Sequence, residues 1–76
     1  MDERIIIDPK ILSGKPIING TRISVEFVLE LLASGMNIED VLKEYPHLKK
    51  KDILAALKYA TSVLRHEEVY PTAQIA

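Results

Sequence analysis

The chain has 76 residues, of which 47% are hydrophobic and 28% are charged, and it contains no cysteine. A chain of this size forms one domain with a small hydrophobic core. The lack of cysteine excludes a disulfide framework and a thiolate zinc site, and no apolar run approaches the roughly 18 residues that span a membrane. We therefore expect a cytoplasmic domain without a membrane-spanning segment.

The sequence offers no candidate residues for catalysis or metal binding. Its two histidines, His47 and His66, lie far apart in the chain. Neither has a carboxylate or a nucleophile at a spacing typical of an active site. We expect no enzymatic activity, no cofactor and no metal.

Charge is distributed unevenly along the chain. The formal net charge is −1, but five basic residues and one acid, Asp52, lie between Pro46 and His66. This segment has a net charge of +4, which leaves −5 for the rest of the chain. Phosphate groups respond to such a local patch rather than to the total charge. The distribution is compatible with a nucleic-acid partner.

Residues 4–23 predict a small β element. Residues 4–7 are mostly β-branched and are followed by the turn signal Asp8-Pro9, which is typical of a short strand. In the segment GKPIINGTRI, residues 14–23, the pair Asn19-Gly20 lies between short β-compatible stretches. This pair is favoured in two-residue type I′ turns, so we expect a tiny hairpin or a tight loop here.

Three helices are predicted after this element, over about residues 25–34, 38–45 and 50–65. Ser24 and Asn37 are suitable N-caps for the first and the second helix. Gly35 ends the first helix and Pro46 ends the second. In the third helix an apolar stripe expected to face the core comprises Ile53, Ala56, Leu57, Ala60 and Leu64. We expect a domain over residues 1–66 and a C-terminal tail over residues 67–76.

The fold class that these elements predict is mainly α, with a small N-terminal β element and three helices in a homeodomain-like helix-turn-helix. A plain three-helix bundle is the alternative. Three lysines at the start of the third helix, Lys49, Lys50 and Lys51, favour the helix-turn-helix. Cations at a helix N-terminus are disfavoured by roughly 0.3–1 kcal/mol each. Because folding does not need this cost, the lysines indicate that an external anion binds here. A run of lysines that is simply solvated is the alternative interpretation.

One face of the third helix has the composition of a DNA-contacting surface. At about 100° per residue, the face opposite the apolar stripe carries Lys51, Ala55, Lys58, Ser62 and Arg65, with Tyr59 on its flank. Small residues would let the helix approach a groove while the cations reach phosphates. An ordinary exposed face is the alternative. Lys15 and Arg22, from the segment 14–23, are further candidates for phosphate contact.

Two apolar features predict protein partners. Phe27 and Leu31 form a second apolar face on the first helix, which the N-terminal strand or a second subunit would cover, and we expect a homodimer. The tail contains Val69, Tyr70 and Ile75, together with Pro71, which suits an extended segment lying on a partner. A tail that folds back onto its own domain, or swaps across a dimer, is the alternative.

Several of these segments together resemble domain-of-unknown-function family 433. The resemblance covers roughly residues 5–65 and rests on GKPIINGTRI, the helix start Ser-Val-Glu, the helix end Leu-Leu-Ala-Ser-Gly, then YPHL, Asp52-Ile53 and AALKYA. It implies a small helix-turn-helix protein of bacteria or archaea, of a kind proposed as VapB-like antitoxins whose genes often neighbour a PIN-like ribonuclease toxin. It also implies that the third helix reads DNA. Lys49 departs from the family, which tends to have Thr or Ser as the cap of that helix, and this weakens the cap by roughly 1 kcal/mol.

These observations give two functional hypotheses. The first is a cytoplasmic DNA-binding antitoxin and autorepressor that neutralises a PIN-like ribonuclease toxin, with duplex DNA and the toxin as its partners. The second is a protein-interaction module that makes no contact with DNA. A salt-dependent shift of duplex DNA would separate them.

Overall fold

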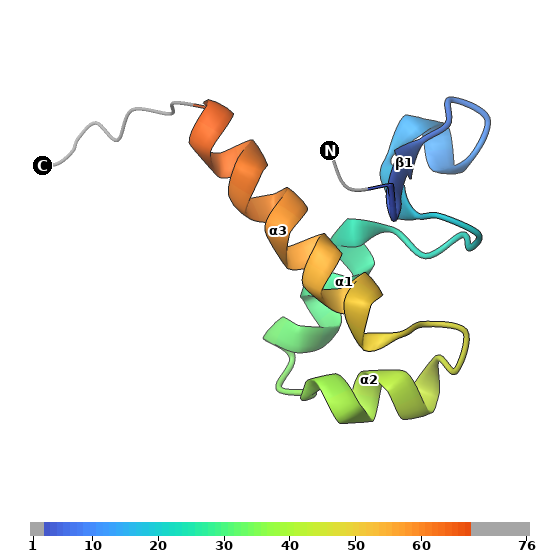
Figure 1. Ribbon diagram of the computed structural model, residues 1–76, viewed down its shortest axis with the longest axis vertical. Helices are drawn as coiled ribbons and strands as arrows, with labels where there is room; N and C mark the ends of the chain where they lie inside the picture. The colour runs from blue at the N-terminus through green and yellow to red at the C-terminus, as the bar shows by residue number, and fades with distance from the viewer. Residues whose placement is uncertain (1–2, 68–76) are drawn as a thin grey trace, which may run out of the picture.

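The computed structural model describes residues 3–67 and consists of three helices and a small antiparallel sheet. In chain order the elements are β1 (Ile5–Ile7), the short 3-10 turn η1 (Leu12–Gly14), β2 (Pro16–Ile18), α1 (Val25–Ala33), α2 (Ile38–Glu44) and α3 (Lys50–Glu67). Figure 1 shows α3 crossing α1, with α2 lying across the N-terminal end of α3. The mainly helical fold with a small N-terminal sheet is the one that the sequence predicts.

The sheet pairs β1 with β2, in a register that places Ile5 opposite Ile18 and Ile7 opposite Pro16. β2 thus pairs with the N-terminal strand, and an isolated antiparallel bridge joins Ile17 to Ser24, so the tight loop predicted at Asn19-Gly20 is confirmed. The turn within this loop is not of type I′. Of this pair only Gly20 has a positive φ, 84°, as a type II turn requires at its third residue, whereas type I′ needs both. The chain still reverses here, because the Thr21 amide donates to the Ile18 carbonyl at 3.0 Å.

Side-chain caps fix where α1 and α2 begin. The Ser24 hydroxyl accepts a hydrogen bond from the Phe27 amide at 2.9 Å. Asn37 and Asp40 form a reciprocal capping box at the start of α2. Both N-caps are those expected from the sequence. The three helices lie within two residues, at either end, of the ranges predicted for them.

The start of α3 is held by a carboxylate rather than by the residue that precedes it. Asp52 accepts the Lys49 amide on one oxygen at 2.9 Å and the Arg4 guanidinium on the other at 3.0 Å. The Asp52 residue is only 7% exposed. The Lys49 side chain has no acceptor atom that could cap the helix. The Asp52 carboxylate instead accepts from the Lys49 amide, one of the backbone donors that would otherwise lack a partner at the helix end. The same contact fastens the segment before β1 to α3.

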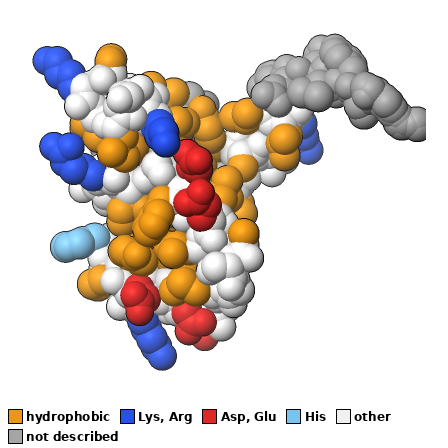
Figure 2. Space-filling model, turned by 180° about the vertical axis from the view of Figure 1, so that it is seen from behind, with side chains coloured by type: hydrophobic (Ala, Val, Ile, Leu, Met, Phe, Trp, Pro, Cys, Tyr) orange, Lys and Arg blue, Asp and Glu red, His pale blue; other side chains and the backbone are white. Residues whose placement is uncertain are grey.

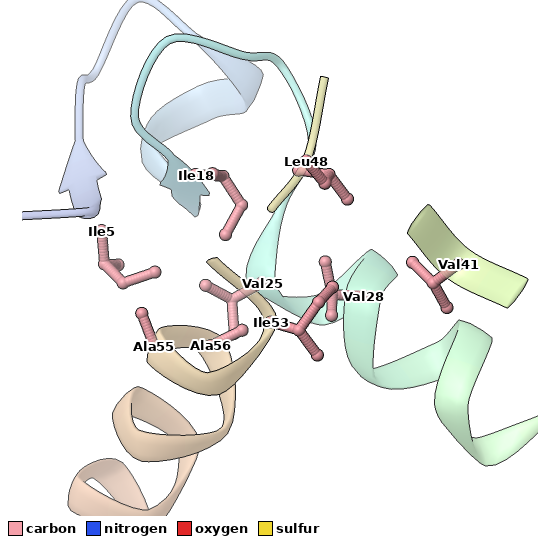
Figure 3. Close-up of a cluster of buried hydrophobic side chains, with 9 residues drawn as sticks. All are labelled: Ile5, Ile18, Val25, Val28, Val41, Leu48, Ile53, Ala55 and Ala56. Atoms are coloured by element: carbon pink, nitrogen blue, oxygen red, sulfur yellow. The ribbon is translucent and has the colours of Figure 1, made fainter. Parts of the chain in front are cut away.

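The core lies where the sheet and the three helices meet. Figure 3 shows nine of its buried side chains, which form one cluster: Ile5, Ile18, Val25, Val28, Val41, Leu48, Ile53, Ala55 and Ala56. Ala55 is 2% exposed and points toward Ile5 in the close-up. The sequence placed Ala55 on the exposed DNA face, and this is wrong. A small residue is needed at this position because the sheet approaches α3 there.

Burial ends abruptly along α3. In its inner part, residues 50–60, Asp52, Ile53, Ala55 and Ala56 are buried, whereas every residue of its outer part, residues 61–65, is exposed. Leu57 and Leu64 were expected in the core stripe, but they are 38% and 71% exposed. The nine residues of α1 span about 13 Å and the eighteen of α3 about 27 Å, so α1 is too short to cover the whole of α3.

Candidate nucleic-acid interface on α3

Exposed cations surround the start of α3. Lys49, Lys50 and Lys51 are all exposed. The one acid of this segment, Asp52, is buried and bound to Arg4, so its negative charge is turned inward and neutralised. The surface around the first turn of α3 therefore carries positive charge that no acid of its own segment compensates.

The row of cations continues along the exposed side of the helix. Lys58 and Arg65 follow Lys51 at intervals of seven residues, which is about two turns or 10.5 Å, and both are exposed. The salt bridges among the described side chains are Arg4–Asp52 and Lys15–Glu26, so no described carboxylate binds these three cations. Their charges are available to an external anion.

The residues between these cations differ from the prediction. Ser62 is exposed, as expected, and its hydroxyl donates to the Tyr59 carbonyl at 2.8 Å. Tyr59 is half-buried and packs against the core, and Ala55 lies beneath the sheet. The exposed apolar residue of the row is instead Leu54, 46% exposed, which the sequence analysis missed. Its spacing of three from Lys51 and four from Lys58 was the available signal.

Lys15 and Arg22 lie in a different environment. The Lys15 ammonium binds the Glu26 carboxylate at 3.1 Å. With Arg22 and Glu30 these residues line an open cavity of about 710 Å³, and all its lining residues come from positions 12–30. The structure therefore groups the two cations with the acids of α1 and not with the row on α3.

The second apolar face of α1 is covered in part by Tyr45, the residue that follows α2. The ring of Phe27 meets that of Tyr45 edge-on, with centroids 5.6 Å apart and an interplanar angle of 89°. Leu31 is half-buried against the core. From the sequence, this face was expected to lie against the N-terminal strand or a second subunit, and Tyr45 was not considered. Figure 2 shows apolar side chains gathered between carboxylates on this side of the molecule. Val69, Tyr70 and Ile75 lie outside the described residues.

A second apolar surface lies between α1 and α3. A groove of about 500 Å³ is lined by Leu29 and Ala33 of α1 and by Ala60, Val63 and Leu64 of α3, among others. This groove was not predicted from the sequence, because it exists only once α3 extends beyond the helix that covers it.

Two further properties concern the described residues alone. None of their helices is both long enough and apolar enough to cross a membrane. Within the same part of the chain, no three histidine, aspartate or glutamate side chains come together to hold a metal ion.

Comparisons with known proteins agree with the resemblance seen in the sequence. The model of the family described as "Protein of unknown function (DUF433)" matches residues 5–60. The chain is similar to the uncharacterized protein y4eO of Sinorhizobium fredii, at 36% identity over 58 residues, which covers 76% of this chain and 26% of that protein.

A solved structure shares the fold. The crystal structure of a DUF433 member protein from Anabaena variabilis superimposes with a TM-score of 0.77 at 28% identity. This match covers 83% of the present chain and 62% of that one. The present chain thus spans about a quarter of the length of y4eO and less than two thirds of the cyanobacterial protein.

Proposed function

The chain belongs to the DUF433 family, and from this premise and the charge on α3 we propose that it binds duplex DNA through the exposed side of α3. The observation that carries the proposal is the row Lys51, Lys58 and Arg65, which no described carboxylate binds, together with the inward-facing Asp52. A protein gains affinity for DNA by bringing such cations to phosphates and releasing the condensed counterions.

The shape of this part of the molecule suits a helix-turn-helix. Residues 45–49 join α2 to α3, and α2 lies across the start of α3 (Figure 1). The major groove, about 12 Å wide, admits one α-helix, and the first residues of a recognition helix contact the base edges. In this arrangement Lys50 and Lys51 meet bases or phosphates, and Leu54 is placed to contact a thymine methyl group.

The family resemblance extends the proposal to a biological role. In this role the chain is an antitoxin and autorepressor that neutralises a PIN-like ribonuclease toxin. Its support is the sequence resemblance, and the toxin-binding segment that goes with it is the tail after α3, which ends at Glu67. Co-expression with a PIN-like ribonuclease from the same genome tests the role, with cell growth as the readout; growth that stays arrested with every such ribonuclease contradicts it.

A protein-interaction module without DNA contact is the second candidate. The observation that favours it is the apolar groove between α1 and α3, because contiguous exposed apolar surface marks a protein interface. The two candidates differ in one property, which is a salt-dependent affinity for duplex DNA.

Titration of duplex DNA at several salt concentrations tests DNA binding. Each lost phosphate contact removes about 0.9 from the slope of log K against log salt, so Lys51→Ala with Lys58→Ala flattens the slope by about 1.8 per chain. Lys10→Ala is the matched control, because Lys10 is exposed, belongs to the turn after β1 and loses the same charge. An unchanged slope in the double variant, or an equal loss in the control, contradicts the proposed surface.

A further inference from the structure

The apolar groove between α1 and α3 is open in the single chain. Its α1 wall contains Leu29 and Ala33, and its α3 wall contains Ala60, Val63 and Leu64. The small side chains of Ala33 and Ala60 leave the room that makes the groove. Leu64 is 71% exposed and Val63 is 38% exposed. Figure 2 shows apolar side chains on this outer part of α3.

The outer part of α3 needs a partner surface for physical reasons. None of residues 61–65 is buried, and short helical segments are marginal in water without tertiary packing. Leu64 gains little hydrophobic stabilisation in the single chain, because 71% of its surface stays exposed to water. A surface of this kind is typical of a protein interface.

The charges beside the groove indicate the chemistry of its occupant. Glu26 and Glu30 of α1 line the groove and are exposed, and no described cation forms a salt bridge with Glu30. An apolar segment that also carries positive charge would therefore fit.

One side of α3, which reaches from the end of its inner part into its outer part, meets this description. Leu57 and Leu64, seven residues apart, form an exposed apolar ridge on this side of the helix. Arg65 follows Leu64 and lies about a quarter turn around the helix from it. The molecule thus carries both a groove with an acidic rim and a ridge with a basic flank.

We propose that a second copy of the chain occupies the groove, so that the outer part of α3 of each copy lies between α1 and α3 of the other. A twofold interface requires one surface to be complementary to itself, and a ridge and a groove on the same helix satisfy this. Val63 and Leu64 are buried at the contact, and Arg65 of each copy meets Glu30 of the other.

This dimer differs from the one predicted at Phe27 and Leu31, where the ring of Tyr45 packs against Phe27. It uses the side of α3 that faces the groove, engages Arg65 at the end of the cationic row, and leaves Lys51 and Lys58 exposed. Because Lys51 and Lys58 lie outside the groove and Leu64 lies outside the cationic row, substitutions at these positions separate loss of DNA affinity from loss of the dimer.

The mass of the full chain in solution, measured by sedimentation equilibrium from low micromolar concentration upward, tests the proposal. The wild type is expected to approach twice the 8.6 kDa chain mass. Leu64→Glu raises the dimer dissociation constant at least about 100-fold, because two leucines leave the interface and two carboxylates enter it. Ala33→Glu, on the opposite wall, has the same effect.

Ser62→Glu is the matched control. It introduces the same charge on the same helix at an exposed position that does not line the groove, and it keeps the wild-type mass. Far-ultraviolet circular dichroism of all variants checks that the helices remain. A monomeric wild type at every concentration, or a Leu64→Glu variant that still forms the dimer, overturns the proposal.

Charge reversal tests the pairing across the interface. Arg65→Glu raises the dissociation constant about tenfold, and adding Glu30→Lys in the same chain restores it, because both new pairs are again opposite in sign. Failure of the second substitution to rescue the first contradicts this pairing.

Deletion of residues 68–76 separates a second copy from the other available occupant, the tail of the chain. A truncated chain that forms the dimer with the wild-type constant supports the proposal. A truncation that turns a monomer into a dimer, or that abolishes the dimer, shows that the tail occupies the groove and overturns it.

Discussion

The two parts of α3 have similar apolar patterns but lie in opposite environments. In the inner part Ile53 is fully buried and Asp52 is held by Arg4, whereas in the outer part Leu64 is 71% exposed. Ile53 and Leu64 both lie at positions where the helical period predicts burial in the core. The difference shows that periodicity identifies which side of a helix is apolar, while the length of the neighbouring helix decides how much of that side the chain itself covers.

The largest expected effect comes from truncating the buried residue. Ile53→Ala lowers the free energy of unfolding by about 2–5 kcal/mol, because it leaves a cavity at the centre of the core. A chain of this size has a total stability of about 4–11 kcal/mol, so the variant loses a large fraction of it.

Leu64→Ala is the matched variant in the outer part. It changes the free energy of unfolding by less than about 0.5 kcal/mol, because this side chain is mostly exposed in the single chain. Urea denaturation at a concentration where the chain is monomeric measures both variants. Equal losses from the two would show that the inner and outer parts do not differ as described.

An intermediate effect is expected at the carboxylate that holds the start of α3. Asp52→Ala lowers the free energy of unfolding by about 1–3 kcal/mol, because the Lys49 amide and the Arg4 guanidinium both lose their acceptor. Thermal melting followed by circular dichroism measures the loss. Asp52→Asn keeps an oxygen for the Lys49 amide and is expected to lose less; an Asn variant as unstable as the Ala variant would assign the effect to the charge alone.

A small gain in stability is expected at Lys49, which occupies the cap position of α3. Lys49→Ser raises the free energy of unfolding by about 0.5–1 kcal/mol, since a hydroxyl can accept one of the free amides of the first turn. In DNA titrations the same variant reduces the salt slope by about 0.9, if Lys49 contacts a phosphate. Lys43→Ser, at an exposed position near the end of α2, controls for the loss of charge alone. A variant that is no more stable than the wild type contradicts this role of the cap.

The sequence determined the elements whose causes are local. Ser24, Asn37 and Gly35 mark helix ends through hydrogen bonds and backbone geometry within a few residues of themselves, so the three helices lie close to the predicted ranges. The run of lysines before and at the start of α3 was equally visible, and all three are exposed. The resemblance to DUF433 also rested on short segments of the sequence, and the family match over residues 5–60 confirms it.

Only the tertiary structure decided which surfaces meet. The strand at residues 5–7 pairs with β2 because Ile5 and Ile18 bury together against α3, a contact that no local turn signal specifies. That contact buries Ala55 and leaves Leu54 exposed among the cations, although both positions lie near the predicted DNA face. The groove beside Leu64 likewise follows from the unequal lengths of α1 and α3. Contacts between segments that are distant in the sequence are set by packing, and the helical period of one segment carries no information about them.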